Sequence, residues 1–75
     1  MQTPKEPNYL ELLKRDYPEE LESNGLVTLL RNRCAYLDRH PEQWEREPKW
    51  FREAYRKDPE AAILEYSYEH LRSFA

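Results

Sequence analysis

The sequence predicts an all-α protein, a compact bundle of four to five short helices. Glycine occurs only once and 36% of the residues are charged, which favours helices, because sheets joined by tight hairpins need several glycines in their turns. There are six prolines, and most stand where a helix can begin, since a proline in the first helical turn sacrifices no hydrogen bond. Six tyrosines, two tryptophans and two phenylalanines supply the large side chains of a core, which disordered chains lack.

Capping residues predict where the helices begin. Asp58, followed by Pro59, has a side chain that can accept a hydrogen bond from the first helical turn. Asn8 stands three residues before Glu11, as in a capping box, and Gly25 marks the end of a short turn and the start of the next helix. The expected helices span residues 8–16, 25–38, 41–46, 48–57 and 59–73, with a turn at 18–22.

Length and composition predict a single small domain. A chain of 75 residues has room for one marginal core, which we expect to cover residues 8–75, with a disordered N-terminus over residues 1–7. Cys34 is the only cysteine, and a lone cysteine is typical of a reducing compartment. No segment has the ~18 apolar residues of a membrane span or the pattern of a signal peptide. We therefore expect a small acidic protein of the cytoplasm, with net charge −3 and no membrane partner.

The helix expected at residues 25–38 has an apolar face that contains an arginine. At about 100° per residue the apolar residues of this face are Leu26, Leu29, Leu30, Cys34 and Leu37. Arg33 falls among them, and departures from the apolar pattern concentrate at strained or functional sites. The favoured interpretation is that Arg33 lies along the helix edge or pairs with a carboxylate of another element. The alternative is that its planar fork binds an acidic group of a partner.

The last helix, at residues 59–73, has an apolar arc of about 200°, which is too wide for a single packing contact and predicts the core element. The arc consists of Ile63, Leu64, Tyr66, Tyr68, His70, Leu71 and Phe74. Ser67 lies at its centre, where a small residue lets another helix approach and its hydroxyl bonds its own backbone. The less favoured alternative is a polar group that faces a ligand. We expect His70 to be a hydrogen-bonded core histidine.

The helix at residues 48–57 separates aromatic from basic side chains. Its expected buried side consists of Trp50, Phe51, Ala54 and Tyr55. The opposite side carries the basic strip, defined as Lys49, Arg52 and Arg56. Such a strip is usually a solvated face, but it is also the best candidate for contact with an anionic group.

The first helix and the turn after it differ in character. The helix has an inward stripe of Tyr9, Leu10, Leu12, Leu13 and Tyr17. The segment that follows forms an acidic corner of Asp16, Glu19, Glu20 and Glu22. Separation of this corner from the basic strip could orient the protein on a dipolar partner.

No pattern of catalytic or metal-binding residues stands out. Catalysis needs a nucleophile beside a base, a pair of carboxylates in a cleft, or a metal. Cys34 lies on an apolar face, where a thiol is usually inert, and it shows no zinc-site spacing with His40 or His70. We therefore predict no enzyme activity, no cofactor and no metal.

Three functional hypotheses remain. The leading one is a non-catalytic protein-interaction module, an adaptor, inhibitor or assembly factor, because Tyr, Trp and Arg dominate binding hot spots. The second is a helix-turn-helix-like regulator that binds nucleic acid through the 48–57 helix, which the isoelectric point of about 5.4 makes less favourable. The third is a homo-oligomer whose interface is sealed by the last helix. The predicted partner-binding residues are Arg33, Tyr36, Trp44, Lys49, Arg52, Arg56, Tyr66 and Tyr68.

Overall fold

Four α-helices and two short 3-10 helices make up the computed structural model, which describes residues 8–73. They are α1 (Tyr9–Asp16), η1 (Pro18–Leu21), α2 (Leu26–Arg39), η2 (Pro41–Arg46), α3 (Lys49–Lys57) and α4 (Pro59–Arg72). The described residues contain no strand, so the predicted all-α class is confirmed. The segment expected as a short helix at 41–46 is a 3-10 helix. The predictions for residues 1–7 and for Phe74 lie outside the described residues.

Local capping explains why the helices begin where they do. The Asn8 side chain accepts a hydrogen bond from the Glu11 N–H at 3.3 Å, and the Asp58 side chain accepts one from the Ala61 N–H at 3.3 Å, as predicted. At the start of α2 the cap comes from elsewhere, because Gly25 has no side chain. There the Glu20 carboxylate accepts a hydrogen bond from the Leu26 N–H at 2.8 Å. Part of the predicted acidic corner therefore caps a helix.

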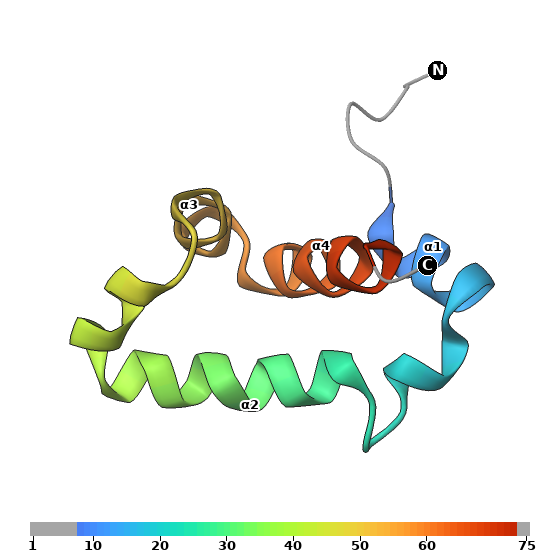
Figure 1. Ribbon diagram of the computed structural model, residues 1–75, viewed down its shortest axis with the longest axis horizontal. Helices are drawn as coiled ribbons and strands as arrows, with labels where there is room; N and C mark the ends of the chain where they lie inside the picture. Colours follow the sequence, from blue (N-terminus) through green and yellow to red (C-terminus); the bar gives the residue numbers. More distant parts are fainter. Residues whose placement is uncertain (1–7, 74–75) are drawn as a thin grey trace.

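Helix α4 is the centre of the bundle and packs against α1, α2 and α3 (Figure 1). Its broad apolar arc is therefore contacted from several sides. Ser67 is fully buried, and its hydroxyl donates a hydrogen bond to the Ile63 carbonyl at 2.8 Å, which confirms the favoured interpretation of this residue. The buried apolar cluster around α4 consists of Leu13, Val27, Leu30, Cys34, Phe51, Ala62, Ile63, Leu64 and Tyr68.

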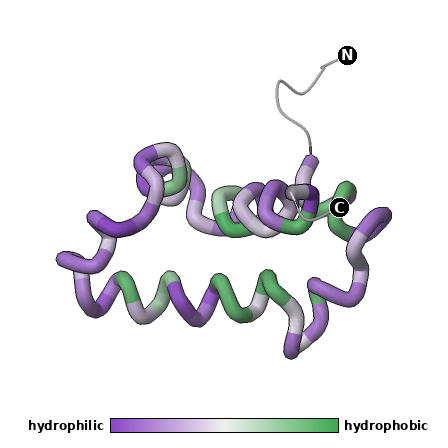
Figure 2. Tube along the Cα trace, viewed as in Figure 1, coloured by the Kyte–Doolittle hydropathy of each residue, from purple (hydrophilic) through white to green (hydrophobic). Residues whose placement is uncertain are grey.

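Several residues expected in the core are exposed instead. Leu29 is 57% exposed, Trp50 43% and Leu10 36%, and His70 is also exposed, so the prediction of a core histidine is wrong. The physical reason for Leu29 is that helices pack on one side of α2 only, and Leu29 lies on the margin of its apolar face. Figure 2 shows hydrophobic positions recurring along α2, whereas η2 and the chain leading to α3 are mostly hydrophilic.

An ion pair fixes the corner between η2 and α3 to α2. The Arg33 Nε–H donates a hydrogen bond at 3.0 Å to the Glu47 carboxylate, and the Nη2 of the same guanidinium donates to the same oxygen. The Glu47 side chain is only 5% exposed, and the Arg33 side chain is 54% exposed. This pair confirms the favoured interpretation, in which Arg33 binds a carboxylate of another element. The contact also raises the pKa of the Arg33 guanidinium, chiefly through the hydrogen bond to Glu47.

Replacing Arg33 with alanine is expected to lower the free energy of unfolding by about 1–3 kcal/mol, because it leaves the Glu47 carboxylate buried without its partner. The half-exposed guanidinium keeps this loss below that of a fully buried pair. Urea unfolding followed by circular dichroism measures the change. Arg39→Ala, at an exposed position of the same helix, is the control and should stay within about 0.5 kcal/mol of wild type. A loss no larger than that of the control would contradict the prediction.

None of the helices within residues 8–73 is both long enough and apolar enough to cross a lipid bilayer.

Candidate functional site

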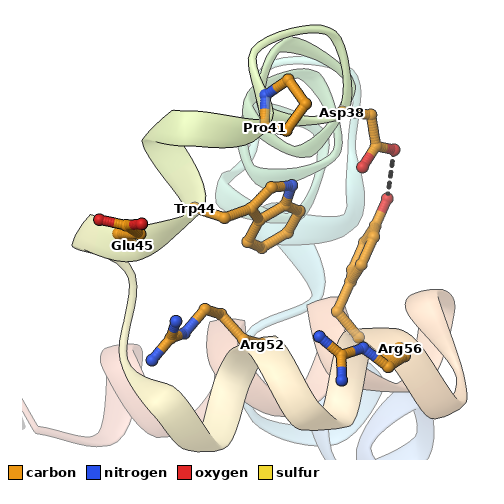
Figure 3. A pocket seen from close by; sticks show the side chains of 7 residues that line it. Asp38, Pro41, Trp44, Glu45, Arg52 and Arg56 are labelled. Carbon is orange, nitrogen blue, oxygen red and sulfur yellow. Dashed lines mark hydrogen bonds between the residues drawn. The ribbon is translucent and has the colours of Figure 1, made fainter.

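A hollow of about 400 Å³ lies between η2 and α3 and is called here the η2–α3 hollow (Figure 3). Its volume falls within the range of small-ligand sites. It is lined by Asp38, Pro41, Trp44, Glu45, Arg52, Tyr55 and Arg56. Three consecutive elements of the chain thus contribute to one concave surface: the end of α2, η2 and the outer side of α3.

Aromatic packing builds the wall of the hollow. Pro41 begins η2 and places Trp44 one turn further on. The Trp44 ring packs against Tyr55, with centroids 4.9 Å apart, and against the buried ring of Phe51 at 6.0 Å. Because the wall rests on the core through Phe51, the position of Trp44 is tied to the fold of α3 and α4.

The basic side of the hollow comes from α3. Arg52 and Arg56 are one helical turn apart, so both guanidinium groups lie on the α3 side of the hollow (Figure 3). The Arg52 Nε is buried and has no hydrogen-bond partner among residues 8–73. A buried donor without an acceptor costs about 1–3 kcal/mol. Arg52 therefore has a donor for which the described chain supplies no acceptor.

The basic strip belongs to a stretch of the described chain, residues 39–57, in which no base has an ion pair; Arg39, Arg46 and Lys57 share this property. Within residues 8–73, no carboxylate lies within ion-pair distance of Lys49, Arg52 or Arg56. The bases outside residues 39–57 do have carboxylate partners, and they are Lys14, Arg15, Arg31, Arg33 and Arg72. Positive charge is thus left unpaired next to the hollow.

The opposite rim of the hollow is acidic. Asp38 accepts a hydrogen bond from the Tyr55 hydroxyl at 2.9 Å, and Glu45 is exposed on η2. Figure 3 shows Glu45 and Asp38 on either side of Trp44, and the two guanidinium groups below them on α3. The hollow therefore has an aromatic wall, a basic side and an acidic rim.

Two groups near this region keep their protons to unusually high pH. Burial, assisted by the hydrogen bond to Asp38, raises the pKa of Tyr55 from 10.0 to about 12. Burial raises the pKa of the Cys34 thiol from 9.0 to about 11 and, with a side chain only 2% exposed, leaves it unsuited to act as a nucleophile. At neutral pH Tyr55 is therefore a donor held by Asp38.

These pKa values predict that the free energy of unfolding declines as pH rises from about 9 to about 12. In this window the unfolded chain releases the protons of Cys34 and Tyr55 while the folded protein retains them. Rising pH therefore stabilises the unfolded state relative to the folded state. Below about pH 9 both states hold the protons and the contribution is fully present. Urea unfolding at several pH values should show a shallower decline for a Cys34→Ala, Tyr55→Phe double variant. Equal slopes for this variant and wild type would contradict the prediction.

The structure gathers three of the predicted partner-binding residues, Trp44, Arg52 and Arg56, in the η2–α3 hollow. Lys49 lines a smaller adjoining hollow of about 150 Å³ together with both arginines. Tyr36 is 48% exposed on α2 and packs on His40 with centroids 4.4 Å apart, outside the η2–α3 hollow.

The remaining predicted residues have mainly structural contacts. Arg33 holds Glu47, as described above. Tyr66 is half-buried with its ring 4.6 Å from that of Phe51. Tyr68, a member of the expected apolar arc, is buried and donates a hydrogen bond to Asp16 at 3.1 Å, so little of its surface is accessible to a partner.

Sequence reasoning missed four residues of the hollow, namely Asp38, Pro41, Glu45 and Tyr55. Tyr55 was assigned to the core, and the two acids carry no local signal. Pro41 carries a local signal, because a proline can begin a short helix. Nothing in the sequence, however, places η2 beside the outer side of α3.

A larger hollow of about 580 Å³ involves α3 and the first turns of α4. It is lined by Trp50, Glu53, Ala54, Lys57, Asp58, Ala61, Ala62 and Glu65. Despite its size, it has one aromatic side chain and mostly acidic polar groups. The η2–α3 hollow is the stronger candidate because its donors are unpaired and its wall is aromatic.

Among residues 8–73, no three His, Cys, Asp or Glu side chains are grouped so that they could hold a metal ion.

Comparison with known proteins finds no matching family model, no matching curated protein and no matching solved structure. The functional argument therefore depends on the fold and on the η2–α3 hollow.

Proposed function

We propose that this protein is a non-catalytic interaction module that binds a larger protein through the face formed by η2 and α3. The observation that carries the proposal is the buried Arg52 Nε, which has no acceptor among residues 8–73 and lies beside the aromatic wall of Trp44 and Tyr55. Tryptophan, tyrosine and arginine dominate the energetics of protein interfaces, especially in pockets that lose water on binding. A partner that supplies an acceptor for Arg52 removes the cost of its unpaired donor.

The chemistry of the hollow supports binding over catalysis. Its lining residues include no serine, cysteine or histidine, and the Asp38 carboxylate is engaged by Tyr55. A nucleophile beside a free base is the minimum for covalent catalysis. The side chains present are suited to recognition, and we place the module in the cytoplasm as an adaptor, inhibitor or assembly factor.

The test compares two tryptophan variants in capture of a partner from native lysate, followed by affinity measurement with the purified partner. Trp44→Ala removes the wall of the hollow and should weaken binding by about tenfold or more, as expected for a hot-spot residue. Trp50→Ala, at a tryptophan that does not line the hollow, is the matched control. Circular dichroism establishes that both variants are folded. Equal affinity of wild type and Trp44→Ala would remove the assignment to this face.

The homo-oligomer hypothesis is the second candidate, but with α2 in place of the last helix as the interface, because the last helix packs against α1, α2 and α3 of its own chain. Leu29 is 57% exposed and Tyr36 48% exposed, and a spacing of seven residues places them on one side of α2. Burying this side against a second copy would remove apolar area from water. Sedimentation equilibrium across a wide concentration range tests the idea, and a monomer at every concentration would reject it.

The nucleic-acid hypothesis has less support. A helix-turn-helix packs its two helices against each other at the turn, whereas here α2 and α3 are joined through η2 and both pack on α4. The acidic rim of Asp38 and Glu45 also faces the basic strip, which weakens attraction for a phosphate backbone.

A further inference from the structure

We propose that the η2–α3 hollow binds the carboxylate of a glutamate or aspartate side chain in an extended segment of the partner, next to a large apolar side chain. This identification of the occupant rests on the proposed function and specifies its chemistry. Three features of the hollow lead to it: the unpaired guanidinium groups, the aromatic wall and the acidic rim.

The guanidinium groups select an anion with two oxygens. An arginine offers the Nε–H and a neighbouring Nη–H as a parallel pair that matches both oxygens of a carboxylate. Among residues 8–73 the Arg52 Nε–H has no acceptor, so turning this edge of the guanidinium toward a bound carboxylate satisfies a donor that was unsatisfied. Arg56, on the same side of the hollow, adds a second positive charge.

The acidic rim selects a single negative charge. Asp38 and Glu45 line the hollow opposite the arginines and repel an anion that carries several charges. A phosphate group or a nucleic-acid backbone brings such charge, whereas one carboxylate beside neutral groups does not. The backbone N–H groups of a peptide are donors that an acidic rim attracts.

The aromatic wall and the volume select the neighbouring side chain. The faces of Trp44 and Tyr55, with centroids 4.9 Å apart, present apolar area beside the guanidinium groups. A volume of about 400 Å³ holds one or two side chains and not a folded element. An acidic residue next to phenylalanine or leucine therefore matches both parts of the surface.

The probe is a terminally blocked, otherwise uncharged peptide with a single glutamate next to a phenylalanine, and its matched control has glutamine in place of that glutamate. The protein carries Trp50→Phe, which leaves Trp44 as the single tryptophan, so fluorescence reports on the hollow. The glutamate peptide should produce a saturable change and bind about tenfold or more tightly than the glutamine peptide, since a charge-assisted hydrogen bond is lost in the control.

Variants of the bases assign the contact. Arg52→Ala should weaken the glutamate peptide by about tenfold or more and leave the glutamine peptide unchanged. Arg52→Lys keeps the charge but not the two-pronged geometry, so its affinity for the glutamate peptide should lie between those of the parent protein and Arg52→Ala. This variant also keeps the test decisive if the alanine variant does not fold. Arg46→Ala removes a base that lies on η2 but does not line the hollow, and it should bind within about twofold of the parent protein.

The outcomes separate the two proposals. Equal binding of the two peptides, or tighter binding of a single-stranded oligothymidylate than of the glutamate peptide, overturns the carboxylate assignment. If either result occurs while the partner still depends on Trp44, the proposed function stands and only the occupant is wrong. If affinity for the partner is also unchanged in Trp44→Ala, both proposals fail.

Discussion

Replacing Phe51 with alanine is expected to abolish cooperative folding of the protein at room temperature. The Phe51 ring is 1% exposed and meets four other rings. Its centroid lies 4.6 Å from Tyr66, 5.9 Å from Trp50, 6.0 Å from Trp44 and 6.1 Å from Tyr55. Truncating a buried phenylalanine costs about 3–5 kcal/mol, and the core of a domain this small rarely supplies more than about 3–5 kcal/mol in total. The loss thus equals the expected stability.

Far-UV circular dichroism and urea unfolding measure this effect. The variant should lose most of its helical signal and show no sigmoidal transition. Trp50→Ala, at a residue 43% exposed, removes a neighbouring aromatic ring from the surface of the same cluster and should keep a cooperative transition. Phe51→Leu tests whether the volume or the aromaticity of the side chain matters. It should lose less stability than Phe51→Ala, because it leaves a smaller cavity. A cooperative transition for Phe51→Ala close to that of wild type would show that α3 is not anchored by this ring.

The helices are predictable from sequence because their start signals are local. Asn8 and Asp58 each accept a hydrogen bond from a backbone N–H three residues ahead, so the signal and its effect lie within one turn. Pro41 and Pro59 stand in the first turn of their helices, where the missing N–H has no cost. The bounds of α1, η2 and α4 consequently lie within one residue of those expected.

The exposed side of each helix is less predictable, because it depends on how many neighbours pack on it. Helix α4 packs against three other α-helices, so these neighbours cover its wide apolar arc. Within residues 8–73 no α-helix covers the side of α2 on which Leu29 lies exposed, and an apolar pattern alone does not reveal this. For α3 the same reasoning explains why Trp50 is 43% exposed while Phe51, the next residue, is buried.

The candidate site is predictable only in part for a related reason. The spacing of Arg52 and Arg56 is a property of one helix and is visible in the sequence. Their meeting with Trp44 and Asp38 requires η2 to lie beside α3, and the Arg33–Glu47 ion pair, which joins residues 14 apart, helps to fix that corner. Sequence reasoning predicted that Arg33 binds a carboxylate but had many acids to choose from.

Replacing Gly25 with alanine is expected to destabilise the protein by about 2–4 kcal/mol, although the same change at a compatible site normally stabilises by about 0.4–1 kcal/mol. The backbone of Gly25, with φ −85° and ψ 174°, suits any residue, so conformation is not the obstacle. A Cβ at this position would overlap the carbonyl group of Glu20 and lie 2.6 Å from its Cα. These are backbone atoms that cannot rotate away, and overpacking of this kind costs about 1–3 kcal/mol.

The collision at Gly25 also reaches the cap of α2. Pushing Glu20 away breaks the hydrogen bond from the Leu26 N–H to its carboxylate, 2.8 Å long, and loss of a helix cap costs about 1 kcal/mol. Urea unfolding of Gly25→Ala measures the sum of both effects. Asn24→Ala, at the exposed preceding residue, should change stability by no more than about 0.5 kcal/mol. A gain in stability for Gly25→Ala would mean that η1 does not approach the start of α2 as closely as the structure has it.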